Sequence, residues 1–228
     1  MTVGMHGVLR GHPWIARVSA DHDLDEDVYS LAVKRAAAYG WSSVHLGPGQ
    51  ELGGRRWEHA DAGGDWSQDG KVRRLAWLTV HPGTDPPARH LPVLPMTQVL
   101  TDALHRVGEV RFTALRSLVP LALASDTGFD LRGDADWFAL SDPAARADIT
   151  LSVSPPPPVP ADRLAAQINR SSQGHVRLNP TPTPNHPPTL RGTAPEWTPH
   201  AAAWITELTI DALRAHGTRT ETEITVSA

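Results

Sequence analysis

Hydrophobic residues recur at three- and four-residue intervals in four segments of this chain, and a glycine follows each segment. This spacing is typical of amphipathic helices, and glycine readily adopts the left-handed conformation that ends a helix. The clearest signals surround the last segment, where Thr198 suits the N-cap and Pro199 the first helical position. The pattern predicts four main helices, at residues 25–39, 96–107, 160–169 and 199–216.

Segments of alternating or β-branched residues lie on either side of these helices and predict strands. Those before the helices are residues 14–18, 75–80, 149–153 and 189–191, and those after them are residues 41–46, 110–115, 175–178 and 221–226. A further short strand is predicted at residues 137–140. The last strand, rich in charged and β-branched residues, is expected to be exposed.

The order of these elements, strand–helix–strand four times over, favours an α+β fold. Two such units make one split βαβ, or ferredoxin-like, sandwich. We therefore predict tandem duplicated ferredoxin-like sandwiches with mostly antiparallel sheets. Residues 1–125 form the first half, 126–146 a junction and 147–228 the second half, packed together as one compact unit. A single larger α/β sheet is the alternative.

Composition limits the cell compartment and the partners. The net charge is −4 without a basic cluster, so we expect no nucleic acid as a partner. The absence of cysteine excludes disulfides and thiolate sites. No run of about 18 apolar residues occurs, so we expect a cytoplasmic protein without a membrane partner. Arginine outnumbers lysine 19 to 2, which suggests a GC-rich bacterial genome.

The stretch RRWEHADAGGDW, residues 55–66, holds the densest set of reactive side chains and is predicted to lie in a loop at residues 47–70. Its His59-x-Asp61 triplet resembles two ligands of a two-histidine, one-carboxylate iron site. A third ligand would have to come from His105, His175 or His186. Because the chain has 12 histidines, such a triplet arises easily by accident, and we expect neither a metal nor another cofactor.

The same stretch supplies the expected ligand-binding residues. Its two indoles bury little by themselves, so they either fold back onto the sheet or wall a pocket. In the second case a guanidinium group would hold an anionic part of the ligand. The predicted ligand-binding residues are Arg55, Arg56, Trp57, Glu58, Asp61 and Trp66.

Three histidines are candidates for proton transfer, because imidazole titrates near neutral pH. His45 and His81 each end a predicted strand, and His59 lies in the loop between them. The alternative interpretation is that the first two are exposed turn residues.

No glycine-rich phosphate loop or serine nucleophile elbow is present. We therefore expect a cofactor-independent bacterial enzyme that acts on a small organic molecule by acid–base chemistry. An isomerase, cyclase or lyase of specialised metabolism fits this description. One alternative is a non-catalytic adaptor or assembly protein, which would bind a partner or form a homo-oligomer. The other is a mononuclear iron enzyme centred on His59 and Asp61.

Overall fold

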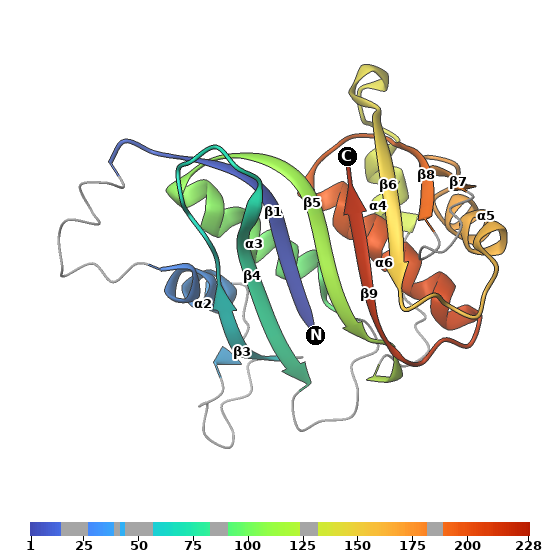
Figure 1. Cartoon of the computed structure of the whole chain (residues 1–228), viewed down its shortest axis with the longest axis horizontal. Helices are drawn as coiled ribbons and strands as arrows, with labels where there is room; N and C mark the ends of the chain where they lie inside the picture. Colours follow the sequence, from blue (N-terminus) through green and yellow to red (C-terminus); the bar gives the residue numbers. More distant parts are fainter. Residues whose placement is uncertain (15–26, 39–41, 44–56, 83–90, 124–131, 182–188) are drawn as a thin grey trace. The chain divides into compact units, whose positions relative to one another are not determined.

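The computed structural model describes residues 1–14, 27–38, 42–43, 57–82, 91–123, 132–181 and 189–228. Within these ranges the chain is α+β, with five α-helices and one large sheet in the order β2-β3-β4-β1-β5-β9-β6-β8-β7 (Figure 1). Its strands are antiparallel, apart from the short β2, which runs parallel to β3. The alternative of one larger sheet therefore fits. None of the described helices has the length and apolar character that a membrane crossing requires.

The strands are β1 (Thr2–Gly11), β2 (Ser42–Ser43), β3 (Trp57–Gly63), β4 (Arg73–Pro82), β5 (Gly108–Pro120), β6 (Ala147–Ser154), β7 (Arg177–Thr181), β8 (Thr189–Ala194) and β9 (Glu221–Ser227). The helices are α2 (Val28–Ala38), α3 (Val93–Val107), α4 (Arg132–Phe138), α5 (Ala161–Ser171) and α6 (Pro199–Ala215). Contacts divide the chain into unit 1, residues 1–88 and 95–113, and unit 2, residues 89–94 and 114–228.

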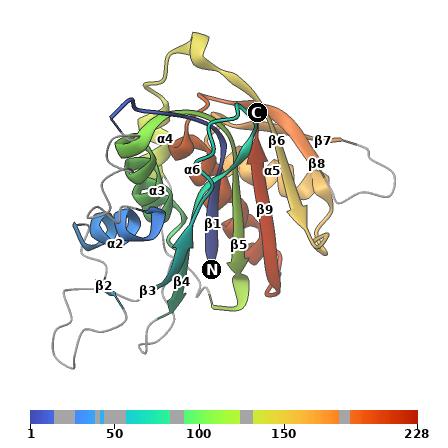
Figure 2. The same ribbon diagram turned by 60° about the vertical axis from the view of Figure 1, so that its left-hand side comes forward.

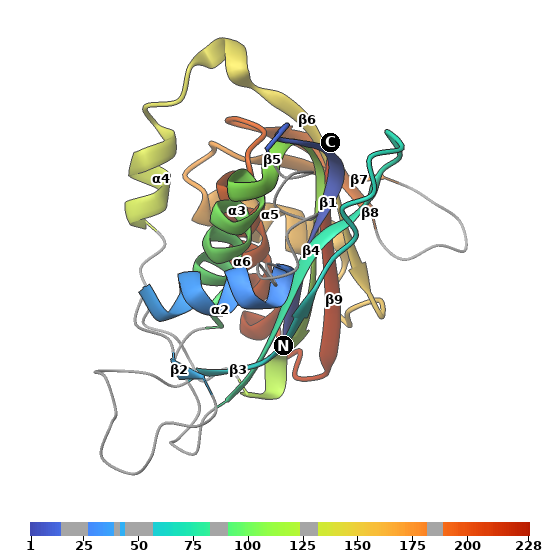
Figure 3. The same cartoon turned by 90° about the vertical axis from the view of Figure 1, so that its left-hand side faces the viewer.

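In unit 1 the elements follow the order β1, α2, β2, β3, β4, α3 and the first half of β5, and the strands are ordered β2-β3-β4-β1-β5. Helices α2 and α3 lie on one side of the strands (Figures 2 and 3). Facing them, Val3 of β1 pairs with Leu78 of β4, and Met5 pairs with Ala76. All four side chains are buried, so the apolar half of each strand forms the core with the helices.

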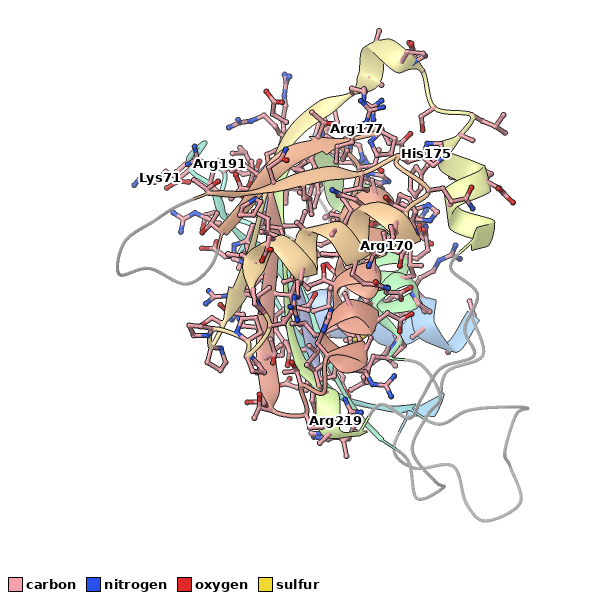
Figure 4. The ribbon with its side chains drawn as sticks, turned by 90° about the vertical axis from the view of Figure 1, so that its right-hand side faces the viewer. Lys71, Arg170, His175, Arg177, Arg191 and Arg219 are labelled. Carbon is pink, nitrogen blue, oxygen red and sulfur yellow. The ribbon has the colours of Figure 1, made fainter. Side chains whose placement is uncertain are left out.

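In unit 2 the elements follow the order β6, α5, β7, β8, α6 and β9, and the strands are ordered β9-β6-β8-β7, with the second half of β5 beside β9. Helices α5 and α6 lie on one side of the strands (Figure 4, where Arg170 marks α5 and Arg177 marks β7). Leu151 of β6 pairs with Leu190 on one side and Val226 on the other, all buried. Apart from the two-residue β2 of unit 1 and the helix α4 that precedes β6, the described elements of the two units follow a similar order along the chain.

The structure contains a strand that was not predicted, and a predicted strand lies mostly outside the described residues. Of the strand expected at residues 14–18, residues 15–18 lie outside the described part, and the first described strand is β1, Thr2–Gly11. Its three glycines weaken the strand signal, but Gly7 is needed because a Cβ there would come 2.3 Å from the carbonyl oxygen of Arg111. The strand predicted at residues 137–140 is wrong, since Trp137 and Phe138 end helix α4.

The prediction of an exposed last strand is also wrong. Strand β9 pairs with β5 on one side and β6 on the other, and its residues Thr222, Ile224 and Val226 are buried. The glutamates at positions 221 and 223 occupy the alternate positions, which makes an internal strand resemble an edge strand in sequence.

Substituting Gly192 with alanine tests the close approach of β7 and β8. The new Cβ would lie 1.7 Å from the backbone oxygen of Arg177, so the two strands would have to move apart. We expect the free energy of unfolding to fall by about 1–3 kcal/mol, measured by chemical denaturation. Gly11→Ala is the control, because its Cβ would meet only the flexible side chain of Gln68, at 3.4 Å. Equal stability of both variants would contradict this packing.

Candidate functional site

The stretch expected to be a loop contains an internal strand. Strand β3 pairs with β4 so that the Cα of Glu58 is the register partner of that of His81, and His59 is the partner of Val80. On its other side β3 pairs with β2, where Ser42 is the partner of Glu58. We call this line of register partners the Ser42–Glu58–His81 row. The row brings together residues that the chain separates widely.

Burial along β4 shows which of its side chains leave the core. Leu78 and Val80 are buried, whereas Trp77 and Thr79 are half-buried and His81 is exposed. Successive side chains of a strand point to opposite faces. The last three therefore lie on the face of the unit 1 sheet opposite α2 and α3, which we call the outer face.

The predicted proton-transfer and ligand-binding residues fall into three groups: some are fully described, some have only their backbone described, and some lie outside the described residues. His81 ends β4 as predicted and is exposed. His45, Arg55 and Arg56 lie outside the described residues. Of Trp57, Glu58 and His59, the described part includes the backbone but not the side chains.

Asp61 and Trp66 have structural partners. The carboxylate of Asp61 is exposed and accepts a 2.9 Å hydrogen bond from the next backbone N–H, that of Ala62. The half-buried indole of Trp66 donates its Nε1–H to the backbone oxygen of Leu75, at 3.0 Å. Of the two alternatives for this indole, the structure shows it folded back against strand β4.

The loop that joins β3 to β4 is fixed by internal contacts. Gln68 donates to the backbone oxygen of Trp66 at 2.8 Å and accepts a 2.7 Å hydrogen bond from the N–H of Gly11 in β1. Arg73 forms ion pairs with Asp65, at 2.7 Å, and with Asp69. The loop is therefore attached to β1, and its carboxylates are neutralised within it.

These contacts lower the pKa values of both carboxyl groups. Hydrogen bonds from Arg73 and from the backbone N–H of Lys71 lower the pKa of Asp69 from 3.8 to about 2. Hydrogen bonds from the hydroxyl and N–H of Ser67 are the main causes that lower the pKa of Asp65. Both groups are thus held as anions.

The described part of the chain contains no cluster of metal ligands that would support the iron hypothesis. Among those residues, no three histidine and acidic side chains are grouped so that they could hold a metal ion. His186, one of the proposed third ligands, lies outside the described part, as does the side chain of His59.

Sequence reasoning missed an aromatic group on the outer face. Trp77 is the register partner of Gly4 in β1 and of Gly63 in β3. The side chain of Arg74 crosses the ring, with its Cζ atom 5.1 Å from the ring centroid. The signal was present in the sequence, because Trp77 occupies a polar position of the alternating segment at residues 75–80.

Comparisons with known proteins give no relative: no family model, no curated protein and no solved structure matches this chain.

Replacing Arg73 tests the charge pairing in the loop. Because the pKa of Asp69 is lower in the folded than in the unfolded chain, its stabilising contribution is present at neutral pH and is lost as the pH falls towards about 2. In Arg73→Gln we expect the titration midpoint of the Asp69 carboxyl carbon, followed by NMR, to rise towards 3.8. Arg106→Gln, which changes an exposed arginine of α3, should leave that midpoint in place. An unchanged midpoint in the Arg73 variant would refute the pairing.

Proposed function

We propose that this protein is a cofactor-independent enzyme that acts on a small organic molecule by acid–base chemistry. The observation that carries the proposal is the Ser42–Glu58–His81 row. It places a hydroxyl-bearing, a carboxylate-bearing and an imidazole-bearing residue at neighbouring positions on three strands. These residue types are the ones that proteins use to move protons near neutral pH.

In this proposal the imidazole of His81 transfers the proton. It is exposed at the end of β4, where a substrate on the outer face can reach it. A carboxylate at the neighbouring register position would fix the orientation of the imidazole, and Glu58 is the candidate for this role. His59, one position along β3, remains a second candidate for proton transfer. Isomerisation, cyclisation or elimination requires no more than such groups.

We also propose that the two units are duplicated ferredoxin-like sandwiches. The support is topological: apart from the two-residue β2 in unit 1 and α4 before β6 in unit 2, each unit has the order strand–helix–strand–strand–helix–strand, and the last strand lies beside the first in the sheet. In such a fold both helices cover one face, so a site on the other face is open to a small molecule. A bacterial, cytoplasmic enzyme of specialised metabolism is consistent with this proposal.

A ligand screen tests the proposed function. We would measure the melting temperature against a panel of small organic acids and carbonyl compounds, because specific binding stabilises the folded state. Compounds that stabilise the protein would then be followed by NMR for chemical conversion. We expect the protein to convert at least one such compound. The variants His81→Gln and Glu58→Gln should each reduce the rate of conversion by about 100-fold or more.

His105→Ala is the matched control for this screen, since it removes an exposed imidazole from helix α3. It should leave both binding and conversion intact. Conversion that survives in His81→Gln would overturn the assignment of His81. A panel without any ligand that is bound and converted would overturn the enzymatic proposal.

A further inference from the structure

The indole of Trp77 lies over Gly63 on the outer face of unit 1, and the first carbon of its side chain lies beside Gly4. Gly4 and Gly63 are its register partners on the two neighbouring strands. A Cβ at Gly63 would lie 2.9 Å from the indole atom Cζ2 and 3.0 Å from Nε1. Any larger residue at position 63 would therefore push the ring away from the sheet.

The second observation is the arginine held on this ring. Arg74 is exposed, and its stem passes over Gly4, where an added Cβ would meet Cδ at 3.3 Å. Its guanidinium carbon lies 5.1 Å from the centroid of the Trp77 ring. Such a contact holds a guanidinium group by attraction between the cation and the ring.

The charge of Arg74 is not neutralised in the described part of the chain. There, Arg73 pairs with Asp65 and Asp69, whereas Arg74 makes no ion pair. Among the described residues, its guanidinium group contacts the ring of Trp77. The guanidinium is thus held in position and exposed, with its charge available to an anion.

This pair of side chains lies on the same face as His81. Trp77 and His81 are four residues apart on β4, which separates their Cα atoms by about 13 Å. A substrate that contacts both must be extended. A system of two or three fused rings that carries a carboxylate has a suitable extended shape.

We propose that Trp77 and Arg74 form a binding platform for a planar aromatic carboxylate, the substrate class of the enzyme proposed above, on which this inference rests. The half-buried indole of Trp77 stacks with the ring of the ligand beside the guanidinium group. The N–H groups of Arg74 bind its carboxylate, for which a guanidinium is geometrically suited. The ring system then extends along β4 towards His81.

Single-stranded nucleic acid also stacks on aromatic and arginine side chains. Its phosphates require clustered basic residues, and this protein carries a net charge of −4. A small aromatic anion needs only one cation, which Arg74 supplies. The charge balance therefore favours the small ligand.

The test uses 2-naphthoate as the probe and isothermal titration of the full chain. We expect saturable one-to-one binding that Trp77→Ala and Arg74→Gln each weaken by about tenfold or more, as the loss of one stacking or ionic contact does. Trp77→Phe keeps a ring over Gly63 and should retain most of the affinity. Trp137→Ala is the control, since Trp137 is an indole of unit 2 that is 63% exposed.

Three further ligands decide the class. 2-Naphthylmethanol has the rings without the charge, and cyclohexanecarboxylate has the charge without an aromatic ring, so both should bind at least about tenfold more weakly. A short oligothymidylate that binds more tightly than 2-naphthoate would overturn the proposal in favour of nucleic acid. So would the absence of probe binding, or equal binding by Trp77→Ala and Arg74→Gln with both variants folded.

The probe also separates this inference from the proposed function. Binding of 2-naphthoate does not require proton transfer, so it should persist in His81→Gln. Persistent binding without any conversion of aromatic acids would support the platform and contradict the acid–base role. Conversion that depends on His81 but not on Trp77 or Arg74 would support the enzyme and contradict the platform.

Discussion

The pairing of β4 with β1 on one side and β3 on the other determines which side chains of unit 1 reach the outer face. A shift of either register by one residue would exchange the two faces of the strand. Trp77 and His81 would then point into the core, and Leu78 and Val80 would be exposed to water. The register is strongly favoured because burying Leu78 and Val80 stabilises the fold by about 1.5–3 kcal/mol for each side chain.

Hydrogen bonds secure this register at both ends of β4. At one end the amino group of Met1 donates to the backbone oxygen of Val80 at 3.0 Å, and the hydroxyl groups of Thr2 and Thr79 lie 2.8 Å apart. At the other end the indole of Trp66 is bound to Leu75. A face held in this way can present Trp77, Arg74 and His81 in fixed positions, which is what recognition of a rigid, planar molecule requires.

The four helices α2, α3, α5 and α6 were predictable from the sequence because their signals are local, whereas α4 was not predicted. Thr198 was expected to cap the last helix, and its hydroxyl accepts the N–H of Ala201 at 3.1 Å. Strand β3 was not predictable, because the charged residues Glu58, His59 and Asp61 hide its alternation. It forms a strand because it pairs with β2 and β4, which are distant from one another in the sequence. The alternation of residues 75–80 indicates the face of Trp77, but the platform also depends on glycines from β1 and β3 lying beside Trp77, which only the pairing of distant segments determines.

The most direct test of this account is the pattern of backbone nuclear Overhauser effects across β1, β4 and β3. The account predicts contacts between Trp77 and both Gly4 and Gly63, and between His81 and Glu58, in agreement with the register of the structure. Contacts displaced by one residue, such as Leu78 with Gly63, would contradict it. They would place the indole and the imidazole on the buried face and remove the proposed site.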